Sequence, residues 1–149
     1  MEIQSLRLSV GEDELNELAQ ELSKDKSAVE NLRVRLTPEG VVVLGDYPAM
    51  LMKMAFETLW EVSGMGSIVC VRLAAVKVSG VPAGMLRSVL LKTIRDMLAH
   101  ETGVRVEDDV IRVDLSQHAS LQKLRLRIHL TAVRCNLGNL TIEAGPKLA

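Results

Sequence analysis

The feature that most constrains this chain is a strict alternation of apolar side chains over residues 50–62. Every even position in this stretch is apolar or nearly so, whereas the odd positions are mixed in character. Successive side chains of a β-strand point to opposite faces, so this period of two predicts one long strand with an apolar face. Methionine is flexible and fills irregular gaps, which makes the face a candidate ligand surface. Its large side chains are Met50, Met52, Met54, Phe56 and Trp60.

The segments on either side have the patterns of further antiparallel strands. Residues 6–10 predict a short opening strand, and residues 32–36, 41–44 and 68–78 predict a four-stranded meander together with the methionine-rich strand. A turn at residues 37–40 joins the first two of these, and Tyr47-Pro48 is expected to end the second. Towards the C-terminus we expect a hairpin within residues 103–115, a helical turn at 116–121, a long strand over 123–133 and a strand over 140–144.

Two segments have helical spacing. Leu15, Leu18, Ala19 and Leu22 predict a short, one-sided helix, with Ser9 and Glu12 at the spacing of a capping box. A longer helix is expected over residues 83–100, ended by Gly103 at a position that helices favour for glycine. Its apolar residues cover more than half of its circumference, beyond the ~100° needed to pack on one sheet, so we expect it to be covered on more than one side. They are Met85, Leu86, Val89, Leu90, Leu91, Ile94, Met97 and Leu98.

These elements predict an α+β fold, in which a curved, mainly antiparallel sheet of long strands packs on one long and one short helix. The chain of 149 residues is expected to form a single domain, 1–149, because a domain of this size buries enough surface to fold without staples. Aromatic residues make up 2% of the chain, so the stacking platforms of single-stranded nucleic-acid binders are almost absent.

Charge and cysteine usage exclude several classes of function. The net charge is −1, so no global field attracts polyanions and nucleic acid is not an expected partner. Cys70 and Cys135 stand far apart, so zinc and dithiol redox sites fail on spacing, and buried free thiols are favoured over one disulfide. No apolar stretch reaches the ~18 residues of a membrane span, and the first residues lack the pattern of a signal peptide. The expected location is the cytoplasm, with peripheral membrane contact left open.

The residues suited to catalysis or metal binding lack the arrangement that either requires. Asp114, Ser116, His118 and Ser120 are hydrolase residue types, but residues two apart on one short segment do not converge as a triad does, and Ser116 as an N-cap explains them equally well. The acidic run 107–109 lacks the glycine of a cation loop, and no glycine-rich phosphate loop follows a strand. We therefore expect no enzymatic activity, no metal and no cofactor, with a hydrolase centred on Ser116 and His118 ranked last.

A basic stripe is the strongest polar pattern. Lys123, Arg125, Arg127 and His129 share one face of the strand expected over residues 123–133. The stripe either holds an anionic headgroup, through Arg125 or Arg127, or pairs across the sheet with acidic neighbours such as Glu57, Glu61 or Glu143. The second interpretation is favoured, because the nearly neutral chain gives the stripe no support.

Apolar faces are more numerous than two helices can cover. One such face is explained by plain core packing at about 1.5–3 kcal/mol per large side chain. Several together indicate an internal groove or an oligomer interface. The leading hypothesis is non-enzymatic binding of a lipid or other apolar ligand between sheet and long helix; the alternative is a homo-oligomeric interaction or structural protein with a dry core. The groove would be lined by Met50, Met52, Met54, Phe56 and Trp60 on the sheet and by Leu86, Val89, Leu90, Ile94 and Met97 on the helix.

The order of these elements resembles a tubular lipid-binding domain, closest to the small bacterial branch of that superfamily. The resemblance covers most of the chain and depends on the strand-helix-meander start, the long strands, the wide-faced helix opened by Gly80-Val81-Pro82-Ala83-Gly84 and the segment Val110-Ile111-Arg112-Val113-Asp114-Leu115. It implies a strongly curved sheet that wraps the long helix and leaves apolar space for acyl chains. Members are commonly exported or membrane-tethered and longer than this chain, so the resemblance also implies a homodimer that completes the groove.

Overall fold

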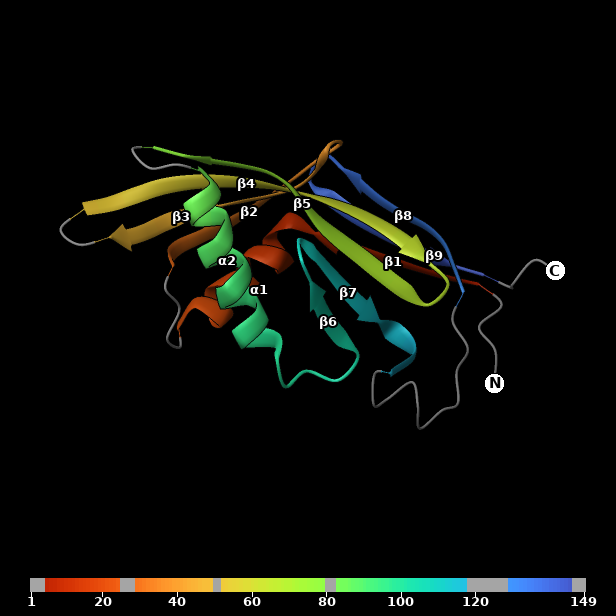
Figure 1. Ribbon diagram of the computed structural model, residues 1–149. Helices are drawn as coiled ribbons and strands as arrows, with labels where there is room; N and C mark the ends of the chain where they lie inside the picture. Colours follow the sequence, from red (N-terminus) through yellow and green to blue (C-terminus); the bar gives the residue numbers. More distant parts are fainter. Residues whose placement is uncertain (1–4, 25–28, 50–51, 80–82, 118–128, 146–149) are drawn as a thin grey trace.

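The computed structural model describes residues 5–24, 29–49, 52–79, 83–117 and 129–145. Within these residues, nine strands form two antiparallel sheets, accompanied by two α-helices and one 3₁₀ turn. The larger sheet curves over the helices, which lie on one side of it (Figure 1). The expected α+β class, with a curved antiparallel sheet packed on one long and one short helix, is confirmed.

The larger sheet has the strand order β2-β3-β4-β5-β7-β6. The consecutive strands β2 to β5 form the expected meander, and the expected hairpin adds β6 and β7 to the first half of β5. Gly66 at a φ of 61° and Asp108 at a φ of 50° allow the tight turns after β4 and β6. The strands are β2 (Glu30–Thr37), β3 (Gly40–Ala49), β4 (Met52–Met65), β5 (Ile68–Val78), β6 (Val104–Glu107) and β7 (Val110–Asp114).

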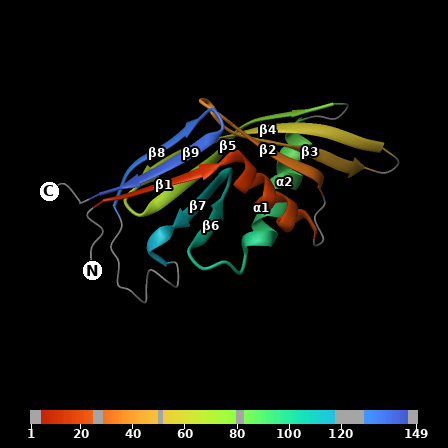
Figure 2. The same cartoon turned by 180° about the vertical axis from the view of Figure 1, so that it is seen from behind.

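The smaller sheet has the order β1-β9-β8, with β1 (Leu6–Gly11), β8 (Leu130–Asn136) and β9 (Asn139–Ala144). It lies beside the end of the larger sheet at which the turn joins β4 to β5 (Figure 2). The Leu130 N–H donates to the Gly66 carbonyl at 2.6 Å. Gly64 allows this close approach, because a Cβ there would lie 2.7 Å from Val133 Cγ2.

The helices α1 (Glu12–Lys24) and α2 (Ala83–Leu98) lie beneath the larger sheet in both views (Figures 1 and 2). α1 packs mainly along β2, and α2 packs on β5 and β6. Leu86 and Leu90 of α2 are buried with Val29 and Phe56 in the main core cluster. Met85 of the same helix is 64% exposed. Within the described part of the chain, the wide apolar face of α2 is therefore only partly covered, because it leaves Met85 exposed.

Two predicted boundaries in the first half of the chain are wrong. β3 does not end at Tyr47-Pro48 but continues to Ala49. Within the described residues, β2 pairs with β3 only as far as Asp46, so Pro48 lies at a free edge, where sheets tolerate a missing N–H.

The second wrong boundary is the start of α1. β1 runs to Gly11, whose N–H donates to Glu14 Oε1 at 3.5 Å, and this replaces the expected capping pair of Ser9 and Glu12. Ser9 Oγ instead donates to Asn139 Oδ1 at 2.7 Å.

The end of the long helix also differs from the prediction. α2 ends at Leu98, so Gly103 is not its cap. Gly103, at a φ of 80°, leads into β6, and its carbonyl accepts a 2.7 Å hydrogen bond from the Asp114 N–H. The helical turn expected at 116–121 is described only as a 3₁₀ turn over Leu115–Gln117. Residues 118–128 lie outside the described part of the chain, and with them most of the strand expected over 123–133.

Candidate functional site

A cavity of about 390 Å³ lies between the larger sheet and the two helices. We call it the apolar groove. Its described lining contains two polar side chains, Thr58 and Thr93, and no charged one. Leu18 in its wall is 50% exposed, so the groove opens to solvent beside α1. The helices contribute Leu15, Leu18 and Ala19 from α1 and Leu90, Thr93, Ile94 and Leu98 from α2.

Antiparallel pairing places the sheet residues of the groove in rows, because directly paired residues share a face. At one end Phe56 pairs with Gly45, and at the other Val62 pairs with Val71, which pairs with Ile111. The groove therefore runs diagonally under the sheet, from β2–β4 to β4–β7. The remaining sheet residues in its wall are Leu32, Val34, Val41, Val43, Thr58, Trp60 and, from β9, Leu140.

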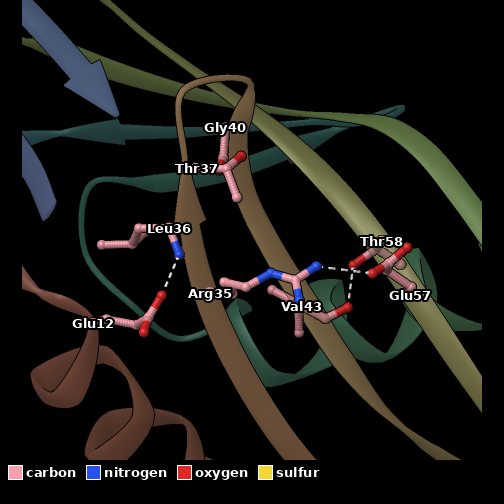
Figure 3. A network of polar contacts seen from close by, with 8 residues as sticks. All are labelled: Glu12, Arg35, Leu36, Thr37, Gly40, Val43, Glu57 and Thr58. Atoms are coloured by element: carbon pink, nitrogen blue, oxygen red, sulfur yellow. Dashed lines mark hydrogen bonds and ion pairs between the residues drawn. The ribbon is translucent and has the colours of Figure 1, made fainter. Parts of the chain in front are cut away.

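The polar atoms on β4 are already hydrogen-bonded within the protein. Thr58, which is 1% exposed, donates its hydroxyl to the Val43 carbonyl at 3.0 Å (Figure 3). The same hydroxyl oxygen accepts a 2.9 Å hydrogen bond from Trp60 Nε1, which holds the buried indole against the sheet. This wall therefore offers a ligand apolar surface and no free hydrogen-bonding group at Thr58 or Trp60.

Side chains of α1 fix this helix to the edge of β2 as a neighbouring strand would. Asn16 Oδ1 accepts from the Val34 N–H at 2.6 Å, and Asn16 Nδ2 donates to the Val34 carbonyl at 2.9 Å. Glu12 Oε1 accepts from the Leu36 N–H at 2.7 Å (Figure 3). The Leu36 carbonyl accepts from the Gly138 N–H at 3.0 Å. These contacts hold the α1 wall of the groove in place and keep this edge from pairing with another strand.

The structure brings only some of the expected ligand residues together. Phe56, Trp60, Leu90 and Ile94 line the groove. Leu86 is buried in the core cluster behind Phe56, and Met54 lies one row beyond Phe56, opposite Tyr47. Val89 is half-buried on α2 and is not part of the groove wall. The other expected residues fall outside the described residues: Met50, Arg125 and Arg127 entirely, and Met52 and Met97 for their side chains.

The sequence patterns did not identify the α1 wall of the groove or the residues that β2, β3 and β7 contribute to it. The apolar spacing of Leu15, Leu18 and Ala19 is visible in the sequence, but it indicates only that this face packs on something. Val34 belongs to an alternating segment, whereas Val43 and Ile111 belong to short apolar runs. Which of these side chains face inward follows from strand register, which is a long-range property. No local signal in the sequence places these residues around one cavity.

The Asp114 carboxylate is hydrogen-bonded within a turn. It accepts hydrogen bonds from Ser116 Oγ at 2.7 Å, from Ser67 Oγ at 2.8 Å and from the Ser116 N–H at 3.0 Å. Burial acts to raise the pKa of Asp114, but these hydrogen bonds and one from Gln117 hold it below its usual value. The Ser116 hydroxyl is thus donated to a carboxylate. His118 and Ser120 lie outside the described residues.

The acidic residues suggested as partners of the basic stripe form ion pairs with other arginines. Glu57 contacts Arg35 at 3.2 Å, as Figure 3 shows, and Glu61 contacts Arg72 at 2.7 Å. Glu143 lies 3.1 Å from Arg134 and 3.7 Å from Arg7. Such exposed pairs contribute only ~0.2–1 kcal/mol each.

Both cysteines are free thiols, and both are half-buried rather than buried. Burial raises the pKa of Cys135, and a hydrogen bond from the Thr37 backbone acts in the opposite direction but has the smaller effect. Cys135 borders a second cavity of about 400 Å³ between the β2–β3 turn, β4 and β8, whose lining includes Glu39, Glu61 and Arg134. Its charged walls distinguish it from the apolar groove.

Two further findings bear on the function. Among the residues that the structure describes, no three His, Cys, Asp or Glu side chains gather as a metal site would require. In the same residues, neither helix is long and apolar enough to cross a membrane.

The fold and the groove define an α+β protein with an apolar cavity of ligand size, since small-molecule sites measure about 300–1,000 Å³. Comparison of this chain with protein-family models, with curated proteins and with solved structures finds no match.

Proposed function

We propose that this protein binds a lipid or similar apolar molecule in the apolar groove and catalyses no reaction on it. The observation that supports this best is the groove itself, which has a volume of about 390 Å³ and no charged side chain in its described lining. Specific ligand sites are concave, mostly apolar and of this size.

Contact between the apolar walls and water favours a bound ligand over an unfilled groove. The groove opens to solvent beside α1, so its walls meet water when it holds no ligand. A bound apolar molecule covers these walls and gains about 0.8 kcal/mol for each of its methylenes that leaves water.

The alternative hypothesis, a homo-oligomer with a dry core, requires a filled interior. A second copy placed over the mouth at Leu18 would cover the groove without filling it. A homodimer stays a prediction from the sequence, and sedimentation at micromolar concentration tests it. A monomer contradicts the dimer and leaves the ligand proposal intact.

Organic extraction of the purified protein followed by mass spectrometry is the direct test. We expect a stoichiometric lipid or other apolar molecule, and stabilisation of the stripped protein when fatty acid or phospholipid is added. Trp60, the single tryptophan of the chain, lies in the groove wall and reports binding through its fluorescence.

A pair of α1 variants provides the control. Ala19→Phe places a ring in the groove from the α1 wall and is expected to abolish the Trp60 response. Glu17→Phe adds the same ring at an exposed position of the same helix and is expected to keep it. No recovered ligand, no stabilisation and no change in Trp60 emission would rule out the proposal.

A further inference from the structure

We propose that the free edge of β1 pairs with β1 of a second copy of this chain, and that the two strands run antiparallel with Leu8 at the two-fold axis. β1 borders the smaller sheet, whose strand order is β1-β9-β8 (Figure 2). The pairing therefore joins the smaller sheets of the two copies into one continuous sheet. It specifies an interaction surface and does not depend on what the apolar groove binds.

The register with β9 determines which backbone groups of β1 point away from the sheet. The Glu12 N–H donates to the Gly138 carbonyl at 3.2 Å, which continues the unbroken register of β1 with β9. Hydrogen-bonded positions alternate along an antiparallel pair. The even-numbered residues of β1 therefore bond to β9, whereas Arg7 and Ser9 direct their N–H and carbonyl groups away from it. Within the described part of the chain, no other strand pairs with β1.

The other sheet edges among the described residues have features that prevent pairing with another strand. Asn16 and Glu12 of α1 bond to the β2 edge. β8 packs on β4, and β6 is only four residues long. Covering an edge or keeping it short is a common protection, as are bulges and charges. β1 has six residues, no bulge in its register and one charged side chain, Arg7, which lies 3.7 Å from Glu143 of its neighbour β9.

Leu8 provides the apolar contact of the proposed pairing. It is 47% exposed, although it shares a face with Leu6 and Ile142, which pack in the core cluster of the smaller sheet. The apolar face therefore extends to the edge strand and ends there with a half-exposed side chain. In a pairing centred on Leu8, this side chain meets Leu8 of the second copy, and Leu6 lies opposite Val10. Apolar surface leaves water at both contacts.

The residues of β1 favour this register over its two neighbours. Centred on Leu8, the pairing places Arg7 opposite Ser9 of the second copy, and each such pair exchanges two backbone hydrogen bonds. Centred on Arg7, it places two arginines directly opposite each other, which is destabilising. Centred on Ser9, it places Arg7 opposite Gly11. The Gly11 N–H already donates to Glu14 Oε1 at 3.5 Å, so fewer hydrogen bonds form.

Cysteine cross-linking tests the register. In a background with Cys70→Ser and Cys135→Ser, Leu8→Cys places two thiols across the axis, where Cα atoms about 4.5 Å apart are within disulfide reach. Mild oxidation is expected to give a disulfide-linked dimer. Ser9→Cys, at the next exposed position, faces an arginine instead of itself and is expected to cross-link at least about tenfold less. Equal cross-linking of the two variants, or none of either, overturns the pairing.

Sedimentation tests the association itself. Because one strand from each copy gives an interface at the low end of the specific range, we expect a reversible dimer, measured from about 1 to about 300 µM protein. Leu8→Lys sets two like charges at the axis and is expected to weaken dimerisation at least about tenfold. Leu137→Lys makes the same change at a position that is 80% exposed in the turn after β8, and this matched control is expected to dimerise normally. A monomer throughout, or a dimer that Leu8→Lys leaves intact, contradicts the proposal.

Amide hydrogen exchange locates the interface. The Arg7 and Ser9 amides are expected to exchange more slowly at high than at low protein concentration, whereas the Leu8 amide, which bonds to β9 of its own chain, changes little. Protection of Arg7 and Ser9 at every concentration means that the same chain covers this edge, and it overturns the proposal. Thermal melts confirm that each variant folds. If Leu8→Lys does not fold, Ser9→Pro decides, because it removes an outward N–H at an edge position where sheets tolerate proline.

Discussion

Replacing Asn16 by alanine removes the contact that holds α1 to the edge of β2. The carboxamide makes two hydrogen bonds to Val34, at 2.6 Å to its N–H and at 2.9 Å to its carbonyl. Each typical hydrogen bond contributes about 0.5–1.5 kcal/mol net, so losing both costs about 1–3 kcal/mol. Alanine returns about 0.5 kcal/mol through its higher helix propensity. The expected net loss is about 1.5 kcal/mol in the free energy of unfolding, or about 3–6 °C in Tm for a chain of this length.

Urea denaturation measures the loss, and amide hydrogen exchange localises it. In Asn16→Ala the Val34 amide is expected to exchange much faster, whereas the Leu36 amide, which donates to Glu12, keeps most of its protection. Glu17→Ala, at an exposed position of the same helix, serves as the control and is expected to stay within about 0.5 kcal/mol of the unchanged protein. Equal stability of the two variants, or an unchanged Val34 exchange rate, would refute the assignment of Asn16 as a substitute strand.

A charged variant adds a pH dependence. Asn16→Asp keeps an acceptor for the Val34 N–H but loses the donor and places a carboxylate against the Val34 and Glu12 carbonyls. Ionisation is therefore disfavoured in the folded state, and the variant is expected to be at least as unstable as Asn16→Ala at pH 7. The difference should shrink in acid, because the protonated carboxyl can donate again. Both variants expose the β2 edge and are expected to aggregate more readily.

Three further outcomes are expected elsewhere in the fold. The pKa of Asp114 is lowered in the folded state. Its contribution to the free energy of unfolding is therefore present above the usual carboxyl pKa of about 3.9 and is lost as pH falls through the lower folded value. Asp114→Asn should cost about 1–2 kcal/mol at pH 7 and little in acid, as denaturation at both pH values will show. Gly64→Val should destabilise by about 1–3 kcal/mol, since even a Cβ meets Val133 at 2.7 Å, whereas Gly84→Ala, with nothing within 4 Å, should not destabilise. Thiol titration of the unreduced, unfolded protein should find Cys70 and Cys135 free, and Cys135 in the folded protein should alkylate slowly at neutral pH because burial raises its pKa.

The strands were predictable wherever side-chain alternation alone defined them. Residues 68–78 were predicted as a strand, and β5 has these bounds, Ile68–Val78. Errors arose where a distant segment decided the outcome. Pro48 stays within β3, and among the described residues β2 pairs with β3 only as far as Asp46. Gly103 belongs to the start of β6 and not to the end of α2, because its carbonyl accepts a hydrogen bond from the Asp114 N–H. Neither contact has a signal in the residues around it.

The candidate site was predictable only in part for the same reason. Phe56, Trp60, Leu90 and Ile94 stood out because their segments carry strong apolar periodicity. Leu86 has the same periodicity, yet it packs behind Phe56 in the core and not in the groove wall. Periodicity identifies which face is apolar, but it does not distinguish a residue in contact with another side chain from a residue beside empty space.

The amino-acid sequence by itself determined an α+β chain of long, apolar-faced antiparallel strands with two amphipathic helices, because the periods of two and 3.6 arise from local backbone geometry. Only the tertiary structure decided that α1 is fixed to the β2 edge through Asn16 and Glu12, and that a continuous apolar space remains between the helices and the sheet. Such a space depends on strand register and on the summed volumes of side chains from distant segments, which no local pattern encodes.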